Sequence, residues 1–329
     1  MIFGPLPVKD ALGAVLAHSV RLQGRKLRKG ETLTQAHIAA LQDAGHAQVI
    51  AAQLEPGDVA ENEAAAHLAE ALVPDPDQAG LRLTTAFTGR VNLMANGPGV
   101  AVLDVDRLHA LNRINPMITL ATVPPFQQMR AGGMVGTVKI ISYAVPGADL
   151  EAACDAARGA VHMAVPVLKT ATLIVTEIPG GAGEKGVPAI AARLEALNIS
   201  LDSVKTVPHE TRHVAQALSG IESDLVLILT GSATSDQQDV APEALREAGG
   251  TVTRFGMPVD PGNLLFLGQL RERPVIGLPG CARSPALNGA DWVLSRVACG
   301  LEVSDDDIAA MGVGGLLKEI PSRPQPRRG

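Results

Sequence analysis

The second half of the chain alternates short apolar runs with segments of helical period, and no other feature constrains the fold as strongly. From Ala171 onward the runs TLIVTEI, DSVKTV and DLVLILT are each followed by a helix-like segment: AIAARLEAL, RHVAQALS and APEALREAGG. The runs TVTRFGM, NLLFLGQL and VIGLPG come next, and the helix-like LNGADWVLSRVACG closes the series. This spacing is typical of βαβ units. We therefore predict an α/β protein whose C-terminal domain is a doubly wound, mostly parallel sheet.

The length of 329 residues is too great for one small core and predicts several units. Residues 1–72 alternate strand-like runs with one helix, TQAHIAALQDAG, and predict a small mixed α+β N-terminal unit. The Pro- and Asp-rich stretch VPDPDQAG is typical of a linker and leads to a middle mixed unit at 81–165. The doubly wound domain is predicted at 171–300, and a C-terminal tail at 301–329.

Three polar loops follow strands of the predicted sheet. Ligands of doubly wound sheets bind outside the carboxyl ends of the strands, so EIPGGAGEKG, TGSATSDQQD and LPGCARSP are candidate binding segments. The first loop is explained equally well as a flexible connection from strand to helix. The second is harder to explain as a plain turn, because Gly231 allows close approach and the hydroxyls of Ser232, Thr234 and Ser235 follow it.

Simple structural explanations also exist for the third loop, for the turn from Asp260 to Asn263 and for Asp239. The third loop combines a sharp turn with a cation and a hydroxyl, at Pro279, Gly280, Arg283 and Ser284. An arginine of this kind clasps phosphate or carboxylate, although taken alone it is more often a surface charge. Upstream, the four residues from Asp260 to Asn263 predict a turn, which a simple hairpin also explains. Asp239 precedes APEALREAGG, where N-capping alone contributes about 1 kcal/mol.

The order of these segments resembles the molybdopterin-binding fold of molybdenum cofactor assembly proteins. TGSATSDQQD, a helix with GG, MPVDPGNLLFLGQL and PVIGLPGCARSP are most similar to the molybdopterin molybdenumtransferase family, over about residues 171–298. In this family the segments read approximately SGG-hydrophobic-S-x-G-x-x-D, MKPGKP-hydrophobic-G and GLPGNPVS. The resemblance implies a protein of molybdenum cofactor biosynthesis. It implies molybdopterin, or its adenylylated form, as a substrate, molybdate as the second substrate, and Mg²⁺ as an accompanying ion.

The resemblance also implies roles for individual residues. Asp239 matches the acidic residue of the family's loop and would act in catalysis by handling protons or orienting water. The reaction would be ligand exchange, in which thiolates of the pterin replace oxygens of molybdate, and no protein ligand to a metal is implied. The residues implied to hold the pterin and its phosphate are Thr230, Gly231, Ser232, Thr234, Ser235, Asp236, Pro261, Gly262, Pro279, Gly280, Arg283 and Ser284.

The chain departs from the family pattern at several of these positions. Ser232 and Asp236 stand where glycines are usual, and the Gly-Asp-Glu cluster expected after the first strand is missing. Asp260 and Asn263 replace the two lysines that flank Pro-Gly. Lysines beside an oxyanion supply positive charge that strengthens in a dry site. Their replacement leaves an alternative open: a non-catalytic carrier or maturation module that works with a nucleotidyltransferase.

The stretch HETRH at 209–213 is a literal HExxH and raises a second alternative, a zinc hydrolase. Its context argues against zinc. Pro208 follows a strand, so we expect His209 at the first helical position or just before it, where the spacing of a helix face is not yet established. The nearest third ligand, Glu222, lies beyond the helix-ending Gly220. We interpret the stretch as the polar start of a crossover helix.

Composition limits the partners. A net charge of −6 and an aromatic content of 2% argue against nucleic acid. Three cysteines without CxxC spacing predict a reducing, cytoplasmic location, and the chain lacks an apolar run long enough for the membrane. The basic stretch 21–31 is more typical of a solvated loop or hairpin than of an anion site, and we assign it no role. The resemblance implies a homo-oligomer, and the tail LKEIPSRPQPRRG is typical of a linker suited to a nucleotidyltransferase partner.

Overall fold

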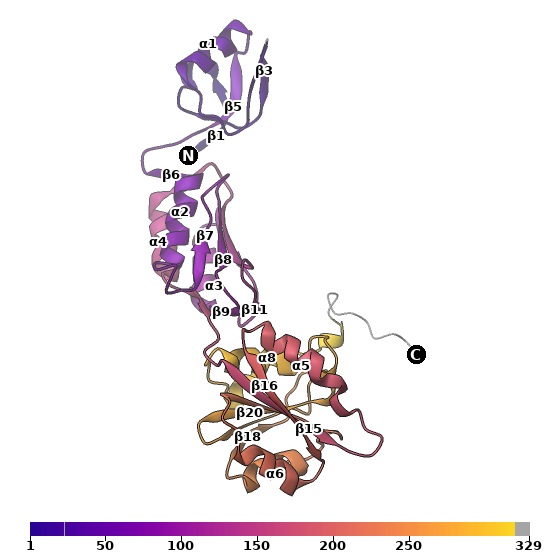
Figure 1. Cartoon of the computed structure of the whole chain (residues 1–329). Helices are drawn as coiled ribbons and strands as arrows, with labels where there is room; N and C mark the ends of the chain where they lie inside the picture. Colours follow the sequence, from indigo (N-terminus) through magenta and orange to yellow (C-terminus); the bar gives the residue numbers. More distant parts are fainter. Residues whose placement is uncertain (23, 320–329) are drawn as a thin grey trace. The chain divides into compact units, whose positions relative to one another are not determined.

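The computed structural model describes residues 1–22 and 24–319 (Figure 1). Contacts within the chain divide it into two compact units. Unit 1 contains residues 1–96, 101–125 and 131–163, and unit 2 contains residues 97–100, 126–130 and the chain from 164 onward. No helix in the described ranges has the length and apolar character that crossing a membrane requires.

The N-terminal part of unit 1 combines a three-stranded antiparallel sheet, with the order β1-β5-β2, and a separate β3-β4 hairpin. Helix α1 begins where Thr34 caps it, because the Thr34 side chain accepts a hydrogen bond from the His37 N–H. The described residues of the basic stretch 21–31 lie on the hairpin and the turn after it. The bounds are β1 Ile2–Pro7, η1 Val8–Asp10, β2 Val15–Leu16, β3 Val20–Leu22, β4 Arg25–Leu27, α1 Gln35–Asp43 and β5 Gln48–Gln53.

The rest of unit 1 is built on a four-stranded antiparallel sheet with the order β10-β12-β8-β7. Helix α2 packs on β8 and β12, and α3 packs on β10 and α4. Strand β13 pairs with β6, and the short strands β11, β9 and β14 form a further sheet, of which β11 and the first two residues of β9 are counted with unit 2. The bounds are β6 Asp58–Ala60, α2 Glu61–Leu72, β7 Leu81–Leu83, β8 Arg90–Ala95, β9 Gly99–Leu103, α3 Val105–Ile114, β10 Ile118–Thr122, β11 Gln128–Met129, β12 Met134–Ile140, β13 Ala144–Pro146, α4 Gly147–Ala157 and β14 Val161–Ala164.

Unit 2 contains a six-stranded sheet with the order β16-β15-β17-β20-β19-β18. The first four strands pair in parallel, and β19 runs antiparallel to both of its neighbours. The prediction of an α/β fold with a mostly parallel sheet is confirmed. The bounds are β15 Thr170–Glu177, η2 Gly183–Gly186, α5 Val187–Glu195, β16 Ser200–Pro208, α6 Thr211–Ser219, β17 Leu225–Leu229, α7 Val240–Glu247, β18 Thr251–Phe255, β19 Phe266–Leu270, β20 Arg273–Leu278, η3 Gly280–Arg283 and α8 Gly289–Ala298.

Helices cover both faces of this sheet, as a doubly wound fold requires. Side chains of the central strand β17 alternate between two buried cores, because successive residues of a strand point to opposite faces. Leu225, Leu227 and Leu229 pack in the core that includes α5 and α8. Val226 and Ile228 pack in the core that includes α6 and α7. All five side chains of β17 are buried, which explains its unbroken apolar sequence.

Residues after α8 also belong to the core of unit 2. Val303, Ile308, Met311 and Leu317 are buried in the same core as α5 and α8. Helix α9, Asp305–Ala310, begins at a capping box in which the Ser304 side chain accepts from the Asp307 N–H. Residues 301–319 were predicted to begin a tail. They instead contribute apolar side chains to the domain, up to η4, Leu317–Glu319. Residues 320–329 of the predicted tail lie outside the described residues.

Candidate functional site

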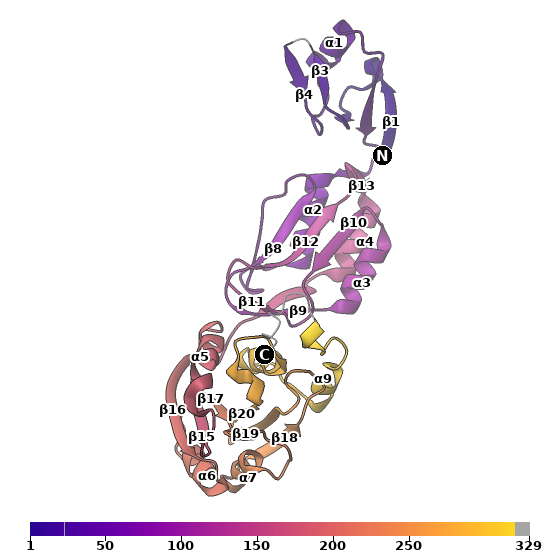
Figure 2. The same ribbon diagram turned by 90° about the vertical axis from the view of Figure 1, so that its right-hand side faces the viewer.

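The carboxyl ends of β15, β17 and β20 lie at one edge of the sheet of unit 2 (Figure 2). Leu229 of β17 is in register with Val175 of β15 and with Leu278 of β20. The loops 178–186, 230–239 and 279–288 leave the sheet at this edge, which we name the loop edge. Strand β19 is antiparallel and starts here, so the preceding turn at 260–263 lies at the loop edge as well.

Gly231 joins the second loop to the end of β15. Its N–H donates to the buried Thr176 hydroxyl at 2.8 Å, and the same hydroxyl is hydrogen-bonded to His209 Nδ1 at 2.8 Å. A Cβ at Gly231 would lie 2.7 Å from the Thr176 carbonyl oxygen, so only glycine fits here. The amide of Gly231 is therefore used within the protein. The missing side chain of Gly231 lets the second loop pack closely against the end of β15.

The threonines of the second loop support the loop itself. Thr230 and Thr234 are both buried, at 5% exposure each. The Thr230 hydroxyl donates to the Ser232 carbonyl oxygen at 2.6 Å and lies 3.2 Å from the Thr234 hydroxyl. Ser232 and Ser235 are exposed, and the Ser235 hydroxyl points back to the Ala233 carbonyl oxygen at 3.4 Å. Of the hydroxyls predicted to bind a ligand, those of the two buried threonines shape the loop and that of Ser232 is accessible.

Asp239 caps α7. The Val240 N–H donates to its Oδ1 at 2.7 Å and the Ser235 N–H donates to its Oδ2 at 2.9 Å. Both carboxylate oxygens thus satisfy backbone N–H groups that the helix start and the loop would otherwise leave unpaired. Asp239 is thus the N-cap of α7, as one interpretation of the sequence had it, and the catalytic role of Asp239 stays a prediction.

Arg283 connects all three loops. Its guanidinium donates from Nη2 to the Thr230 carbonyl oxygen at 2.9 Å, which ties the third loop to the second. A Cβ added to Gly186, at the end of the first loop, would lie 2.7 Å from Arg283 Cγ. Burial lowers the pKa of the Arg283 guanidinium, yet arginine stays protonated in proteins. Its Nε is buried and has no hydrogen-bond partner among the described residues.

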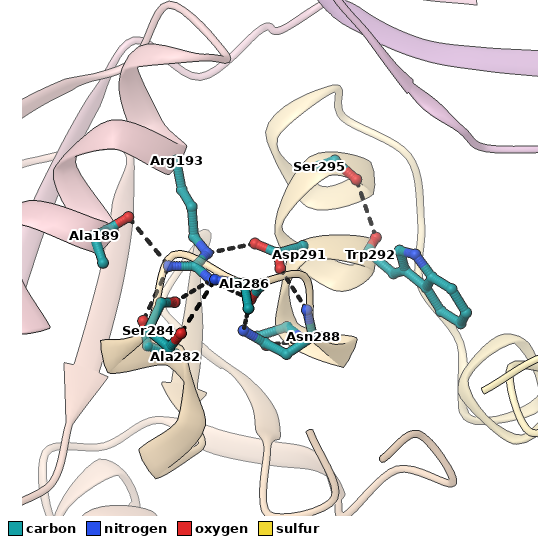
Figure 3. A network of polar contacts seen from close by, with 10 residues as sticks. Ala189, Arg193, Ala282, Ser284, Ala286, Asn288, Asp291, Trp292 and Ser295 are labelled. Atoms are coloured by element: carbon teal, nitrogen blue, oxygen red, sulfur yellow. Dashed lines mark hydrogen bonds and ion pairs between the residues drawn. The ribbon is translucent and has the colours of Figure 1, made fainter. Parts of the chain in front are cut away.

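Arg193 of α5 fixes the shape of the third loop (Figure 3). Its guanidinium pairs with the Asp291 carboxylate and donates to the carbonyl oxygens of Ala282 at 3.0 Å, Ser284 at 2.8 Å and Ala286 at 3.1 Å. The planar fork of arginine can reach several acceptors at once. Both side chains of the ion pair are only 12% exposed. Arg193 therefore holds the loop that presents Arg283.

The turn at 260–263 packs on the start of α8. The Gly289 N–H donates to the Pro261 carbonyl oxygen at 2.9 Å, and a Cβ at Gly262 would lie 2.7 Å from the Gly289 nitrogen. Asp260 forms an ion pair with Lys318 at 2.7 Å. The third loop leads directly into α8, so the turn and this loop meet through the start of that helix.

An open hollow of about 770 Å³ lies beside the second loop. Its lining residues are Asp236, Gln237, Gln238, Glu243 and Arg246. Arg246 pairs with Glu243 at 2.9 Å and donates to the Gln237 carbonyl oxygen at 2.7 Å. Asp236 belongs to the predicted binding set, and this hollow places it on the side of α7.

The structure brings most of the predicted residues together. The residues of the second and third loops are in direct contact through Arg283 and Thr230, while Pro261 and Gly262 reach the same edge through α8. Two residues that organise the edge, Thr176 and Arg193, were not predicted, and His209 was considered only as part of the HExxH stretch. Thr176 lies in an apolar strand and Arg193 in an amphipathic helix, where neither residue type indicates a special role. The Gly-rich first loop did include Gly186.

The HExxH stretch starts a helix, as the sequence predicts. Helix α6 begins at Thr211, so His209 lies outside it and bonds to Thr176 on β15. His213 Nδ1 lies 3.1 Å from a Glu210 carboxylate oxygen. In the described ranges, no group of three or more His, Cys, Asp or Glu side chains is arranged to hold a metal ion.

Family models match two parts of the chain. Residues 172–296 match the family model described as "Probable molybdopterin binding domain". Residues 5–53 match a model described as a domain of unknown function. No curated protein matches the chain at a significant level.

Several solved structures are similar to the chain at low identity. The molybdopterin biosynthesis MoeA protein from Pyrococcus horikosii is 13% identical, with 91% of this chain and 75% of that chain covered and a TM-score of 0.32. The protein CinA from Thermoplasma acidophilum is 16% identical, with 35% and 90% covered and a TM-score of 0.25. A molybdenum cofactor biosynthesis protein from Pyrococcus furiosus is 13% identical, with 92% and 66% covered and a TM-score of 0.25.

Proposed function

We propose, on the premise that residues 172–296 belong to the molybdopterin-binding domain family, that the loop edge of unit 2 binds molybdopterin through its phosphate. We further propose that the protein inserts molybdate into the dithiolene of the bound molybdopterin, as the sequence resemblance implies. Self-association and a nucleotidyltransferase partner remain proposals of the same kind.

One observation supports phosphate binding above the others: the half-buried Arg283 guanidinium has no carboxylate partner among the described residues. Its hydrogen bond at 2.9 Å goes to a neutral acceptor, the Thr230 carbonyl oxygen. A partly buried charge is unfavourable without an ionic partner, and such charges in proteins are usually paired. A phosphate would supply the missing negative charge and further acceptor oxygens.

Other groups at the loop edge fit the same ligand. Ser232 exposes a hydroxyl, and the backbone at Gly280 is exposed at the start of η3. Gly186 and Gly231 let the loops pack closely at this edge, because protein atoms lie within 3 Å of where a Cβ would stand at either position. We assign the polar pterin atoms to these loops and the phosphate to Arg283.

The test is molybdopterin binding by the wild type and by Arg283→Gln, measured through the fluorescence of the single tryptophan, Trp292 of α8. A hydrogen bond to a charged group contributes roughly 1.5–3 kcal/mol, so the substitution should weaken binding by about ten- to a hundred-fold. Arg271→Gln is the matched control, because Arg271 is exposed in the turn before β20, at the opposite edge of the sheet. Equal affinity of Arg283→Gln and the wild type would refute the phosphate assignment.

The carrier alternative has one specific observation in its favour: both oxygens of Asp239 are occupied by backbone N–H groups. Incubation of the protein with molybdopterin and molybdate, followed by measurement of metallated cofactor, separates the two functions. Insertion predicts metal gain that falls in Asp239→Asn, which keeps one capping oxygen. Binding without metal gain, unchanged in Asp239→Asn, would favour the carrier.

A further inference from the structure

The C-terminal segment of unit 2 returns to the turn at 260–263. The Asp260 N–H donates to the Gly315 carbonyl oxygen at 2.8 Å, and the Leu317 N–H donates to the Asp260 carbonyl oxygen at 2.9 Å. Leu317 is only 2% exposed and packs in the core of α5 and α8. These contacts hold the C-terminal segment against the backbone of Asp260. Lys318, which follows Leu317, therefore lies beside the Asp260 carboxylate.

The position of this carboxylate matters for an anionic ligand. Asp260 lies in the turn that packs on the start of α8, at the edge where the third loop presents Arg283. A carboxylate near a phosphate repels it over distances up to the Debye length, about 8 Å at physiological ionic strength. The Lys318 ammonium lies 2.7 Å from the Asp260 carboxylate and offsets its charge.

We propose that Lys318 neutralises Asp260 and thereby keeps the loop edge favourable for an anionic pterin phosphate. This inference rests on the proposed function. Lys318 acts through Asp260 and is a charge-compensating residue that does not itself hold the ligand. The C-terminal segment thus sets the charge of a residue that lies 58 positions earlier in the sequence.

The geometry separates this role from a structural one. The Lys318 and Asp260 side chains are 54% and 40% exposed, and exposed ion pairs contribute little to the free energy of unfolding. The docking of the segment depends on the backbone hydrogen bonds and on buried Leu317. Another cation near this turn, Arg254, is already paired with Asp305 at 2.7 Å. Loss of the Lys318 charge should therefore change ligand affinity more than stability.

A double-substitution cycle tests the inference, with molybdopterin affinity and the thermal midpoint measured for each variant. Lys318→Met keeps the length of the side chain and removes its charge, and should weaken binding about three- to ten-fold at low salt and less at high salt. Asp260→Asn should bind at least as tightly as the wild type. The double variant should match Asp260→Asn, and Lys318→Arg should match the wild type. Glu272→Gln, an exposed carboxylate at the opposite edge, should have no effect.

Three outcomes would overturn the inference alone. The first is wild-type affinity in Lys318→Met. The second is a double variant that binds as weakly as Lys318→Met, which would mean that Lys318 acts on the ligand or the fold without Asp260. The third is a thermal midpoint that falls together with affinity in Lys318→Met. A wild type that does not bind molybdopterin at all would instead refute the proposed function.

Discussion

At the scale of single residues, the loop edge depends on glycines that make room for an arginine. Gly186 ends η2 and has φ −87° and ψ −15°, a backbone conformation that alanine adopts without strain. A Cβ there would nevertheless lie 2.7 Å from Arg283 Cγ and 2.8 Å from Leu229 Cδ2. The need for glycine at this position comes from packing, and Arg283 is one of the two side chains involved.

We therefore expect Gly186→Ala to displace Arg283 and to lower the free energy of unfolding by about 1–3 kcal/mol, as overpacking does. Urea denaturation measures the free energy of unfolding. The affinity for molybdopterin should fall together with this free energy. Gly220→Ala is the control, because Gly220 has φ −107° and none of the described atoms lies within 4 Å of its added Cβ. Stability and affinity of Gly186→Ala equal to those of Gly220→Ala would contradict the described packing.

At the scale of elements, helix α5 sets the shape of a loop that lies far away in the sequence. Arg193 reaches acceptors 89 to 98 residues later in the chain, at Ala282, Ser284, Ala286 and Asp291. Lysine carries its donors on one nitrogen and cannot span these acceptors. Part of the order of the third loop therefore comes from α5.

We predict that Arg193→Lys speeds amide hydrogen exchange in residues 282–286 and weakens molybdopterin binding, with a smaller change in the rest of α5. Hydrogen exchange with mass spectrometry measures both regions in one experiment. Arg212→Lys, on the exposed side of α6, should leave the exchange of residues 282–286 unchanged. Unchanged exchange in Arg193→Lys would show that the loop holds its shape without the fork of the guanidinium.

The elements of unit 2 were predictable because their signal is local. The run at 224–230 became β17, Leu225–Leu229, and the segment at 241–250 became α7, Val240–Glu247. The contacts of the loop edge were not predictable in the same way. Thr176 resembles any strand threonine until the fold places Gly231 and His209 beside its hydroxyl. The many hydroxyls of the second loop correctly indicated a special loop, although the hydroxyls of Thr230 and Thr234 support the loop itself.

At the scale of the whole molecule, each unit contains its own buried thiol. Cys154 lies on α4 of unit 1, and Cys299 follows α8 in unit 2. Burial raises the pKa of both thiols to about 11. The thiolate is the reactive form, so both cysteines should be inert in the folded protein.

We predict that Cys154 and Cys299 react with iodoacetamide at pH 8 more than about 100-fold more slowly than an unfolded cysteine, whose pKa is about 8.5. Peptide mapping across a urea gradient should then report the opening of unit 1 and unit 2 separately. A Cys281→Ser background keeps the third cysteine out of the measurement. Alkylation of either thiol at the rate of an unfolded cysteine without urea would mean that its unit opens readily in the native protein.

The most direct test of the central claim is a crystal structure of the protein with bound molybdopterin. We expect the phosphate at the loop edge, with an oxygen within about 3.2 Å of a guanidinium nitrogen of Arg283 and the pterin against the second and third loops. Molybdopterin bound elsewhere, with no phosphate oxygen beside the Arg283 guanidinium, would contradict the proposed function.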